Sequence, residues 1–273
     1  MTTLRLTVEY DGTEFSGFQW QPEARTVAGV LEDALGRLLS ESVKVTAAGR
    51  TDSGVHASGQ VVSIATRGRF PFERLLLALN ALLPNDCSVR EATIVDDDFS
   101  ARFSARERTY VYTVLNRAYR SALLARYAWH VAGPLDLAAM RAAGAYLLGE
   151  HDFRAFASST LRPGAPVSTV RTVRRLELER EGDLVRIEIA ADGFLHHMVR
   201  TIAALLAECG LGRRIPEEVA AILAARDRSG AGSTAPAQGL CLAGVRYADG
   251  YDSFAEPPAL GRLAALDGER AFP

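Results

Sequence analysis

The amino-acid sequence predicts an α+β protein made of two tandem domains, each with an antiparallel sheet that carries helices on one face. Strand-like and helix-like segments follow one another in the order β-α-β-β-α-β, and the same order returns in the second half of the chain. A length of 273 residues also exceeds that of a typical single domain. The repeated order is the split βαβ unit of ferredoxin-like folds. We therefore expect two ferredoxin-like domains with a cleft between them.

The first domain is predicted over residues 1–100. Residues 4–10 alternate apolar and polar side chains, as a half-buried strand does, and Asp11-Gly12 ends this pattern. Thr26 is the predicted N-cap of a helix whose apolar residues share one face as far as Leu39. The remaining elements are strands over 43–47, 61–66 and 87–95 and a helix over 72–82.

The second domain is predicted over residues 101–252. Its elements are strands over 109–115, 170–178, 184–190 and 240–247 and helices over 137–148 and 195–209. Pro216 at a helix start predicts an extra helix to residue 225. The boundary follows the acidic run 96–98, where arginines begin, and residues 253–273 form a Pro-rich tail that we expect to be irregular.

Composition is that of an ordinary globular protein, with 48% hydrophobic and 23% charged residues. No run approaches the roughly 20 apolar residues of a membrane span, and the first residues enter a strand pattern without a signal-peptide core. We therefore expect a cytoplasmic protein without membrane contact. The cysteines Cys87, Cys209 and Cys241 are far apart and form no Cys-x-x-Cys pair, which favours buried free thiols.

The charge pattern bears on nucleic acid. A net charge of −2 argues against a protein that coats nucleic acid indiscriminately. Arginines nevertheless cluster between residues 102 and 126, interleaved with aromatic side chains, which is typical of a surface for phosphates and bases. Because Lys44 is the only lysine, the arginine total reflects a general preference for arginine, and only the clustering is informative.

A polar loop bounded by glycines lies between two predicted strands, at residues 49–57. It places Asp52 two positions from Arg50, and Gly49 and Gly54 permit positive φ angles and the close approach of a ligand. One interpretation is an Asx-turn with exposed charges, and the other is a carboxylate presented into a cleft. Composition alone leaves both open.

The loop Gly49–Ala57, followed by Gly59-Gln60-Val61, resembles the catalytic signature of the bacterial TruA family of tRNA pseudouridine synthases. Further similar segments lie at 10–12, 17–19, 98–105, 108–110, 194–200 and 235–240. The resemblance implies an isomerase that acts on tRNA at uridines 38, 39 and 40 of the anticodon stem-loop. It also implies a homodimer that needs neither a metal nor a cofactor.

The resemblance assigns chemical roles to four residues. Asp52 is the nucleophile that detaches uracil from its ribose. Arg200, from the second domain, pairs with Asp52, and an opposite charge within about 4–6 Å keeps a carboxylate ionised. Tyr110 lies against the target uracil and assists proton transfer, and Leu240 forms an apolar wall. Without the resemblance, Arg200 reads as a helix-surface arginine, and Tyr110 and Leu240 as packed residues.

Two arginines are assigned to the RNA itself. Because a uridine in a stem must leave its stack before the glycosidic bond is reached, Arg50 is implied to support the flipped state. Arg102 is implied to contact the RNA backbone. By composition alone, both are solvent-facing charges. His56 orders the loop in our interpretation, because the mechanism requires no base there.

Two other functions compete with this one. A non-catalytic tandem RNA-binding protein fits two such sheets, although no RNP1-like aromatic run is present. A metal-dependent hydrolase would use Asp52 with the acidic run 96–98. His196 and His197 are disfavoured as metal ligands, since neighbouring residues point in different directions. The sequence departs from the family pattern at Thr201, where asparagine is expected, and in the Ser158 to Pro166 loop.

Overall fold

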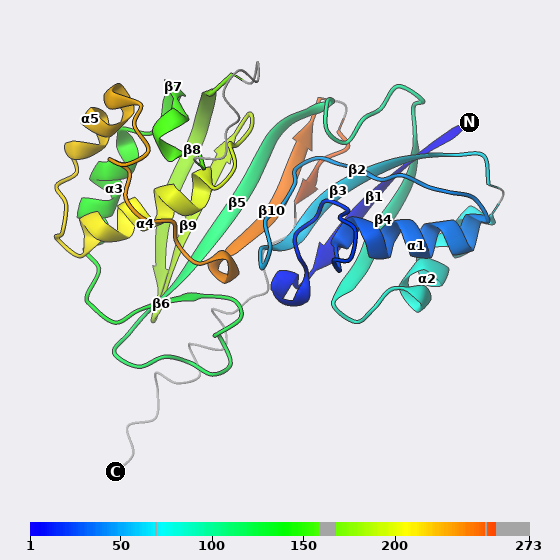
Figure 1. The fold of residues 1–273 in the computed structure, drawn as a ribbon, viewed down its shortest axis with the longest axis horizontal. Coiled ribbons are helices and arrows are strands. Elements are labelled where there is room, and N and C mark those ends of the chain that lie inside the picture. Colours follow the sequence, from blue (N-terminus) through cyan, green and yellow to red (C-terminus); the bar gives the residue numbers. More distant parts are fainter. Residues whose placement is uncertain (69, 159–167, 249, 255–273) are drawn as a thin grey trace, which may run out of the picture. The chain divides into compact units, whose positions relative to one another are not determined.

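The computed structural model describes residues 1–68, 70–158, 168–248 and 250–254. The described residues form eleven strands and five α-helices, which confirms the predicted α+β class. Figure 1 shows how these elements follow one another along the chain. The chain divides into two compact units. Unit 1 contains Met1–Arg108 and the described residues from Cys241 on, and unit 2 contains Thr109–Leu240. The predicted domain limits at residues 100 and 252 stay a prediction.

Unit 1 has the predicted split βαβ connectivity. Its central strand β1 pairs antiparallel with both β3 and β4, and β2 pairs antiparallel with β3. The order β4-β1-β3-β2 is the order expected when each helix connects two parallel strands that are not neighbours. The elements are β1 (Thr2–Tyr10), α1 (Val27–Leu39), β2 (Thr46–Ala47), β3 (His56–Thr66), α2 (Phe72–Leu82) and β4 (Cys87–Val95).

Helices α1 and α2 lie side by side along the strands of unit 1 (Figure 1). The N-cap of α1 is Thr26, as predicted, and its side chain accepts a hydrogen bond from the Gly29 amide. Strand register aligns Leu6 with Val62, and both side chains are fully buried. The buried apolar residues of the two helices include Leu31, Leu35, Leu75 and Leu79.

The opposite face of this sheet is buried as well, which differs from the half-buried strand that alternation predicts. Arg5 on β1 is only 2% exposed, and its guanidinium donates to Glu91 Oε2 at 3.0 Å and to the Asp252 carbonyl at 3.3 Å. Strand β10 (Leu240–Tyr247) runs parallel to β3, and β11 (Ser253–Phe254) pairs with β10. A second core cluster contains Ala48, Val61, Val95, Phe99, Ala101, Val245 and Tyr247.

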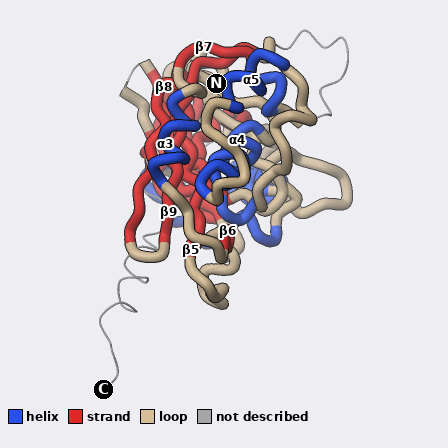
Figure 2. The backbone as a smooth tube through the Cα atoms, turned by 90° about the vertical axis from the view of Figure 1, so that its left-hand side faces the viewer, coloured by secondary structure: helices blue, strands red, loops and turns tan. Residues whose placement is uncertain are grey.

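Unit 2 has strands in the order β5-β9-β8-β7, with helices gathered on one side of them in Figure 2. The short strand β6 runs parallel to β5. The elements are β5 (Ala105–Asn116), β6 (Trp129–Val131), α3 (Leu137–Ala145), β7 (Gly149–Asp152), β8 (Val170–Glu181), β9 (Leu184–Ala191), α4 (Met198–Gly210) and α5 (Glu218–Ala225). The sequence predicts neither β6 nor β7.

Two helix ends in unit 2 differ from prediction for backbone reasons. Helix α4 begins at Met198, three residues late, because His197 adopts a left-handed conformation with φ of 67°. Helix α3 ends at Ala145, and the chain then turns at Gly149, whose φ is 96°. Of the loop Ser158 to Pro166, only Ser158 belongs to the described residues.

The cysteines have the predicted environment. Cys87, Cys209 and Cys241 are buried and unpaired. Burial raises the pKa of the Cys241 thiol to about 11 and that of Cys87 to about 12, so both thiols stay protonated near neutral pH. In the part of the chain that the structure describes, no helix has the length and apolar character that a membrane span requires.

Candidate active site

The loop that carries Arg50 and Asp52, which we call the nucleophile loop (Gly49–Val55), connects β2 to β3 in unit 1. Its first residue is held by Gln60, a fully buried side chain on β3. Gln60 Nε2 donates to the Gly49 carbonyl at 2.7 Å, and Gln60 Oε1 accepts from the Gly49 amide at 3.4 Å. Both backbone polar groups of Gly49 are therefore bound by the side-chain amide of one buried residue. Arg50 follows directly and is exposed.

The residue before Asp52 is fixed by a buried tyrosine. The Tyr10 hydroxyl and the Thr51 Oγ1 atom lie 2.8 Å apart, and Gln60 Nε2 also donates to the Tyr10 hydroxyl at 3.3 Å. Tyr10 and Thr51 are both buried, whereas Asp52 is half-buried. This network fixes the backbone on the N-terminal side of the Asp52 carboxylate.

The other side of the nucleophile loop lies on residues 11–18, which we call the cradle. The Phe18 amide donates to the Thr51 carbonyl at 3.0 Å. Ser53 Oγ and the Gly54 amide both donate to the Phe15 carbonyl, at 3.2 and 3.4 Å. The similar segments 10–12 and 17–19 thus contain Tyr10 and Phe18, two direct partners of the nucleophile loop, and Phe15 lies between these segments.

Two glycines of the cradle allow this close approach. A Cβ atom on Gly12 would lie 2.0 Å from the Val55 carbonyl oxygen, where no side chain fits. Gly17 has a φ of 90°, and a Cβ atom there would lie 3.0 Å from the Thr51 carbonyl oxygen. The Gly12 amide also donates to His56 Nδ1 at 3.0 Å, so this buried imidazole joins the first residue after the nucleophile loop to the cradle.

The far end of the cradle is connected to the start of β4. Arg25 forms a bidentate pair with Asp86 at 2.8 and 2.7 Å, and its guanidinium lies 4.1 Å from the centre of the Phe15 ring. The hydrogen bonds to Asp86 raise the pKa of Arg25. Such a partly exposed pair contributes little stability. The Arg25 guanidinium packs on the ring of Phe15, and the carbonyl of Phe15 accepts two hydrogen bonds from the nucleophile loop.

Arg102 lies on a turn at residues 100–104, also in unit 1. The turn is rigidly attached, because the Ala101 amide donates to Ser63 Oγ at 3.0 Å and the Tyr247 hydroxyl donates to the Ala101 carbonyl at 2.8 Å. Arg102 is exposed, and its guanidinium lies 5.3 Å from the ring centre of Phe103, which is 80% exposed. This turn can present a cation to a phosphate.

Other arginines of the cluster are engaged within the protein. Arg108 donates to backbone carbonyls, including those of Ala48 and Arg102. Arg117 lies 3.4 Å from Asp183 and donates to the Tyr119 carbonyl. The arginines Arg102, Arg106, Arg120 and Arg126 of the same cluster are exposed, so a surface for phosphates and bases stays a prediction.

Tyr110 and Tyr112 lie on β5 in unit 2. The Tyr110 ring meets Phe194 edge to face, with centroids 5.2 Å apart at 90°. Tyr112 is fully buried, and its hydroxyl donates to the Pro236 carbonyl at 2.8 Å. Burial raises the pKa of Tyr112, and the charge of Arg200 partly opposes this shift. Tyr112 is thus a packed core residue, as its strand position suggests.

Arg200 lies in the first turn of α4 and is half-buried. Its Nε donates to the Ala235 carbonyl at 2.8 Å, and the Ala235 amide donates back to the Arg200 carbonyl at 3.1 Å. Leu240, at the start of β10, is 5% exposed. A Cβ atom on Gly239 would lie 2.7 Å from Tyr112 Cζ, so residues 235–240 lie against both Arg200 and Tyr112.

The six predicted site residues therefore belong to two groups. Arg50, Asp52 and Arg102 are in unit 1. Tyr110, Arg200 and Leu240 are in unit 2, and the pairing of Asp52 with Arg200, which joins the two units, stays a prediction. Sequence reasoning missed Gln60, Tyr10 and Arg108 as supports of the site, although all three lie within the similar segments.

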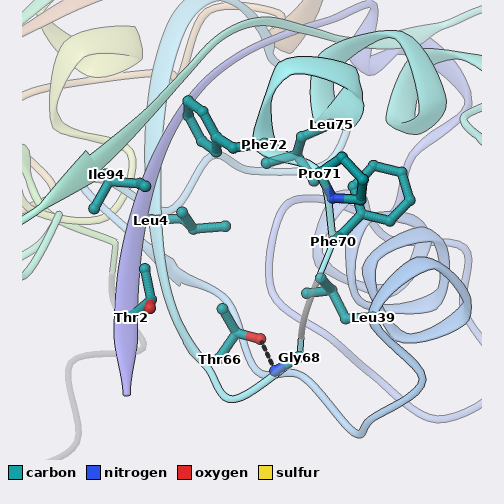
Figure 3. A pocket seen from close by; sticks show the side chains of 10 residues that line it. All are labelled: Thr2, Leu4, Leu39, Thr66, Gly68, Phe70, Pro71, Phe72, Leu75 and Ile94. Atoms are coloured by element: carbon teal, nitrogen blue, oxygen red, sulfur yellow. Dashed lines mark hydrogen bonds between the residues drawn. The ribbon is translucent and has the colours of Figure 1, made fainter.

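A pocket of about 450 Å³ also opens in unit 1, drawn in Figure 3. Its lining is mostly apolar, with Leu4, Phe72 and Ile94 among the side chains. At its polar edge the Gly68 amide donates to Thr66 Oγ1 at 2.9 Å. None of the predicted site residues lines this pocket, and among the described residues its lining contains no charged side chain.

Comparison with known proteins bears directly on these residues. The family model described as tRNA pseudouridine synthase matches residues 6–104 and 143–248. The chain belongs to the tRNA pseudouridine synthase family. The matched segments include the nucleophile loop, the cradle, Arg102, Arg200 and Leu240, whereas Tyr110 lies between them.

Individual relatives of this synthase family match over nearly their whole length. A protein named tRNA pseudouridine synthase A from Moorella thermoacetica is 47% identical over 250 residues, which cover 90% of this chain and 100% of the relative. The protein of the same name from Myxococcus xanthus is 45% identical over 270 residues, or 98% of each chain. That of Halalkalibacterium halodurans is 47% identical over 241 residues, or 88% of this chain and 90% of the relative.

Proposed function

We propose that this chain is an isomerase that converts uridine to pseudouridine in the anticodon stem-loop of tRNA, at positions 38, 39 and 40. The observation that carries the proposal is the match to tRNA pseudouridine synthases across the segment that contains the nucleophile loop. A non-catalytic tandem RNA-binding protein is not favoured, because the relatives are named as synthases.

Asp52 is the nucleophile in this proposal. Its carboxylate attacks ribose C1′ or adds to the base. In either case the bond between C1′ and uracil N1 breaks, the uracil turns and its C5 bonds to C1′. The bond to Asp52 then breaks, C5 loses its proton and N1 gains one. Substrate and product contain the same atoms, so the reaction needs no co-substrate, and we propose that it uses no metal or cofactor. A rigid loop favours such chemistry, because a positioned carboxylate does not have to be ordered in the transition state.

The other residues support this step. Arg200 supplies a positive charge that keeps Asp52 ionised, and Tyr110 and Leu240 contact the uracil. Arg50 holds the flipped state, which fits its exposed position directly beside the fixed Gly49 peptide. Arg102 contacts a backbone phosphate from its exposed turn. We further propose a cytoplasmic homodimer that binds tRNA.

The decisive experiment maps pseudouridine in tRNA treated with the purified protein and with Asp52→Asn. This substitution preserves shape and removes the charge, so tRNA affinity stays near that of the wild type while product formation ceases. A matched control is Asp136→Asn, at the exposed N-cap of α3, where asparagine caps a helix as well as aspartate does.

Two results would count against the proposal. If the wild-type protein forms no pseudouridine in any tRNA, the proposed activity is wrong. Asp52→Asn with a single-turnover rate within tenfold of the wild type would remove the nucleophile, since tenfold is only about 1.4 kcal/mol of barrier.

A further inference from the structure

We infer that Arg108 is a positioning residue that holds the nucleophile loop and the Arg102 turn in one fixed arrangement, so that Arg50 and Arg102 meet the same RNA. The inference rests on the proposed function, in which both arginines contact tRNA. Charge patterning suggests instead that Arg108 is a phosphate contact of its own.

The guanidinium of Arg108 is occupied by main-chain carbonyls. Its Nε and Nη2 donate to the Ala48 carbonyl at 3.2 and 3.0 Å. Nη2 also donates to the Arg102 carbonyl at 2.7 Å, and Nη1 donates to the Ala105 carbonyl at 3.3 Å. Arg108 and its three partners all belong to unit 1, and the Arg108 side chain is half-buried.

Two of these carbonyls, those of Ala48 and Arg102, belong to the segments that carry the proposed RNA contacts. Ala48 is 3% exposed and precedes Gly49, whose peptide is bound by Gln60, and Arg50 comes next. The Arg102 carbonyl belongs to the turn that Ser63 and Tyr247 fix through Ala101. Arg108 therefore connects, by direct hydrogen bonds, two segments that are more than fifty positions apart in the sequence.

Only arginine fits this task. A guanidinium is planar and carries five N–H donors in a fixed geometry, so it can bind several carbonyls at once. A lysine ammonium is a compact charge on a flexible stem, and it keeps the charge without spanning the carbonyls. Arg108→Lys therefore separates geometry from charge.

The test uses the full-length protein with Arg108→Lys and the matched control Arg141→Lys. Arg141 on α3 donates one hydrogen bond to the Leu178 carbonyl at 2.8 Å, and neither residue belongs to the proposed site. The measurements are the Kd of a fluorescent anticodon stem-loop RNA, the single-turnover rate at saturating tRNA, and the thermal unfolding midpoint. We expect Arg108→Lys to weaken RNA binding about tenfold and Arg141→Lys to match the wild type.

A double-mutant cycle distinguishes positioning from a merely structural role. In an Arg50→Ala, Arg102→Ala background, Arg108→Lys should weaken binding by less than about twofold, because the residues that it positions are gone. Methylguanidinium should restore RNA affinity to Arg108→Ala. Three results would overturn the inference. Arg108→Lys could weaken RNA binding by the same factor in both backgrounds, Arg108→Lys could bind RNA with the wild-type Kd, or methylguanidinium could leave the affinity of Arg108→Ala unchanged. Wild-type protein without pseudouridine formation would instead count against the proposed function, and the affinity cycle would still test Arg108.

Discussion

The side-chain amide of Gln60 donates to the Gly49 carbonyl at 2.7 Å and to the Tyr10 hydroxyl at 3.3 Å, so one buried group fixes both ends of the segment that leads to Asp52. Tyr10 in turn lies 2.8 Å from Thr51 Oγ1. The orientation of the proposed nucleophile therefore depends on a residue that is itself fully buried.

Gln60→Met keeps the length of this side chain and removes its hydrogen bonds. The Gly49 peptide and the Tyr10 hydroxyl lose a buried partner, which should lower the free energy of unfolding by about 1–3 kcal/mol. The single-turnover rate should fall more than tRNA affinity does. Urea unfolding and rate measurements check this, with Gln21→Met as control, because Gln21 bonds the Ser16 carbonyl from an exposed position. An unchanged single-turnover rate would show that the hydrogen bonds of Gln60 do not position Asp52.

Gly12→Ala introduces a methyl group 2.0 Å from the Val55 carbonyl oxygen, and the cradle must move away from the nucleophile loop. Overpacking of this kind typically destabilises by about 1–3 kcal/mol, and we expect a comparable loss here together with slower turnover. Gly230→Ala is the matched control, since its methyl group would meet the Asp227 carbonyl at an ordinary 3.5 Å. Equal unfolding midpoints for the two variants would contradict the prediction.

Tyr110→Phe and Tyr110→Ala separate the hydroxyl from the ring. If the phenol assists proton transfer, the Tyr110→Phe variant should bind tRNA normally, and the rate of its chemical step should fall by a factor of about 10²–10⁴. Ala also removes the ring that contacts Phe194 and should lose a further ~1–3 kcal/mol of stacking on the base. Tyr112→Phe is the control, because that hydroxyl binds the Pro236 carbonyl. Wild-type single-turnover rates in both Tyr110 variants would remove this residue from the site.

Thr201→Val tests a buried hydroxyl in α4. Among the described residues, Thr201 Oγ1 has no hydrogen-bond partner, and the side chain is fully buried. Removing an unsatisfied polar atom while keeping its shape should raise the free energy of unfolding, by about 1 kcal/mol. Urea titration measures this, and a loss of stability would mean that the hydroxyl is bound in solution.

The periodicity of apolar residues was sufficient to predict the bounds of several longer helices and strands. Helix α2 and strands β4 and β10 have the predicted bounds, because each is long enough for its apolar spacing to repeat. Strands β6 and β7 are too short for any period, and their positions depend on pairing with β5 and β8. The burial of Arg5 was not predictable either, since its partner Asp252 comes from the other end of the chain.

The site shows the same limit. The loop with Asp52 was recognisable from its sequence, because glycines, hydroxyl side chains and charges recur there in a fixed order. No comparable sequence pattern shows whether an arginine side chain points to solvent or binds groups inside the protein. Arg102 and Arg108 look alike in the sequence, yet one side chain is exposed and the other binds three carbonyls. Tertiary contacts decide which arginine is available to a phosphate.

Unit 1 recruits residues 241–254 to complete its sheet and to cover Arg5, a separation of 247 positions in the case of Asp252. During synthesis on a ribosome, the amino-terminal segment therefore emerges long before its final strands do. Domains usually fold in the order in which they are made. Here the sheet of the unit that bears Asp52 can be completed only after residues 109–240 have been translated, so a nascent chain that stops before β10 lacks the last strands of this unit.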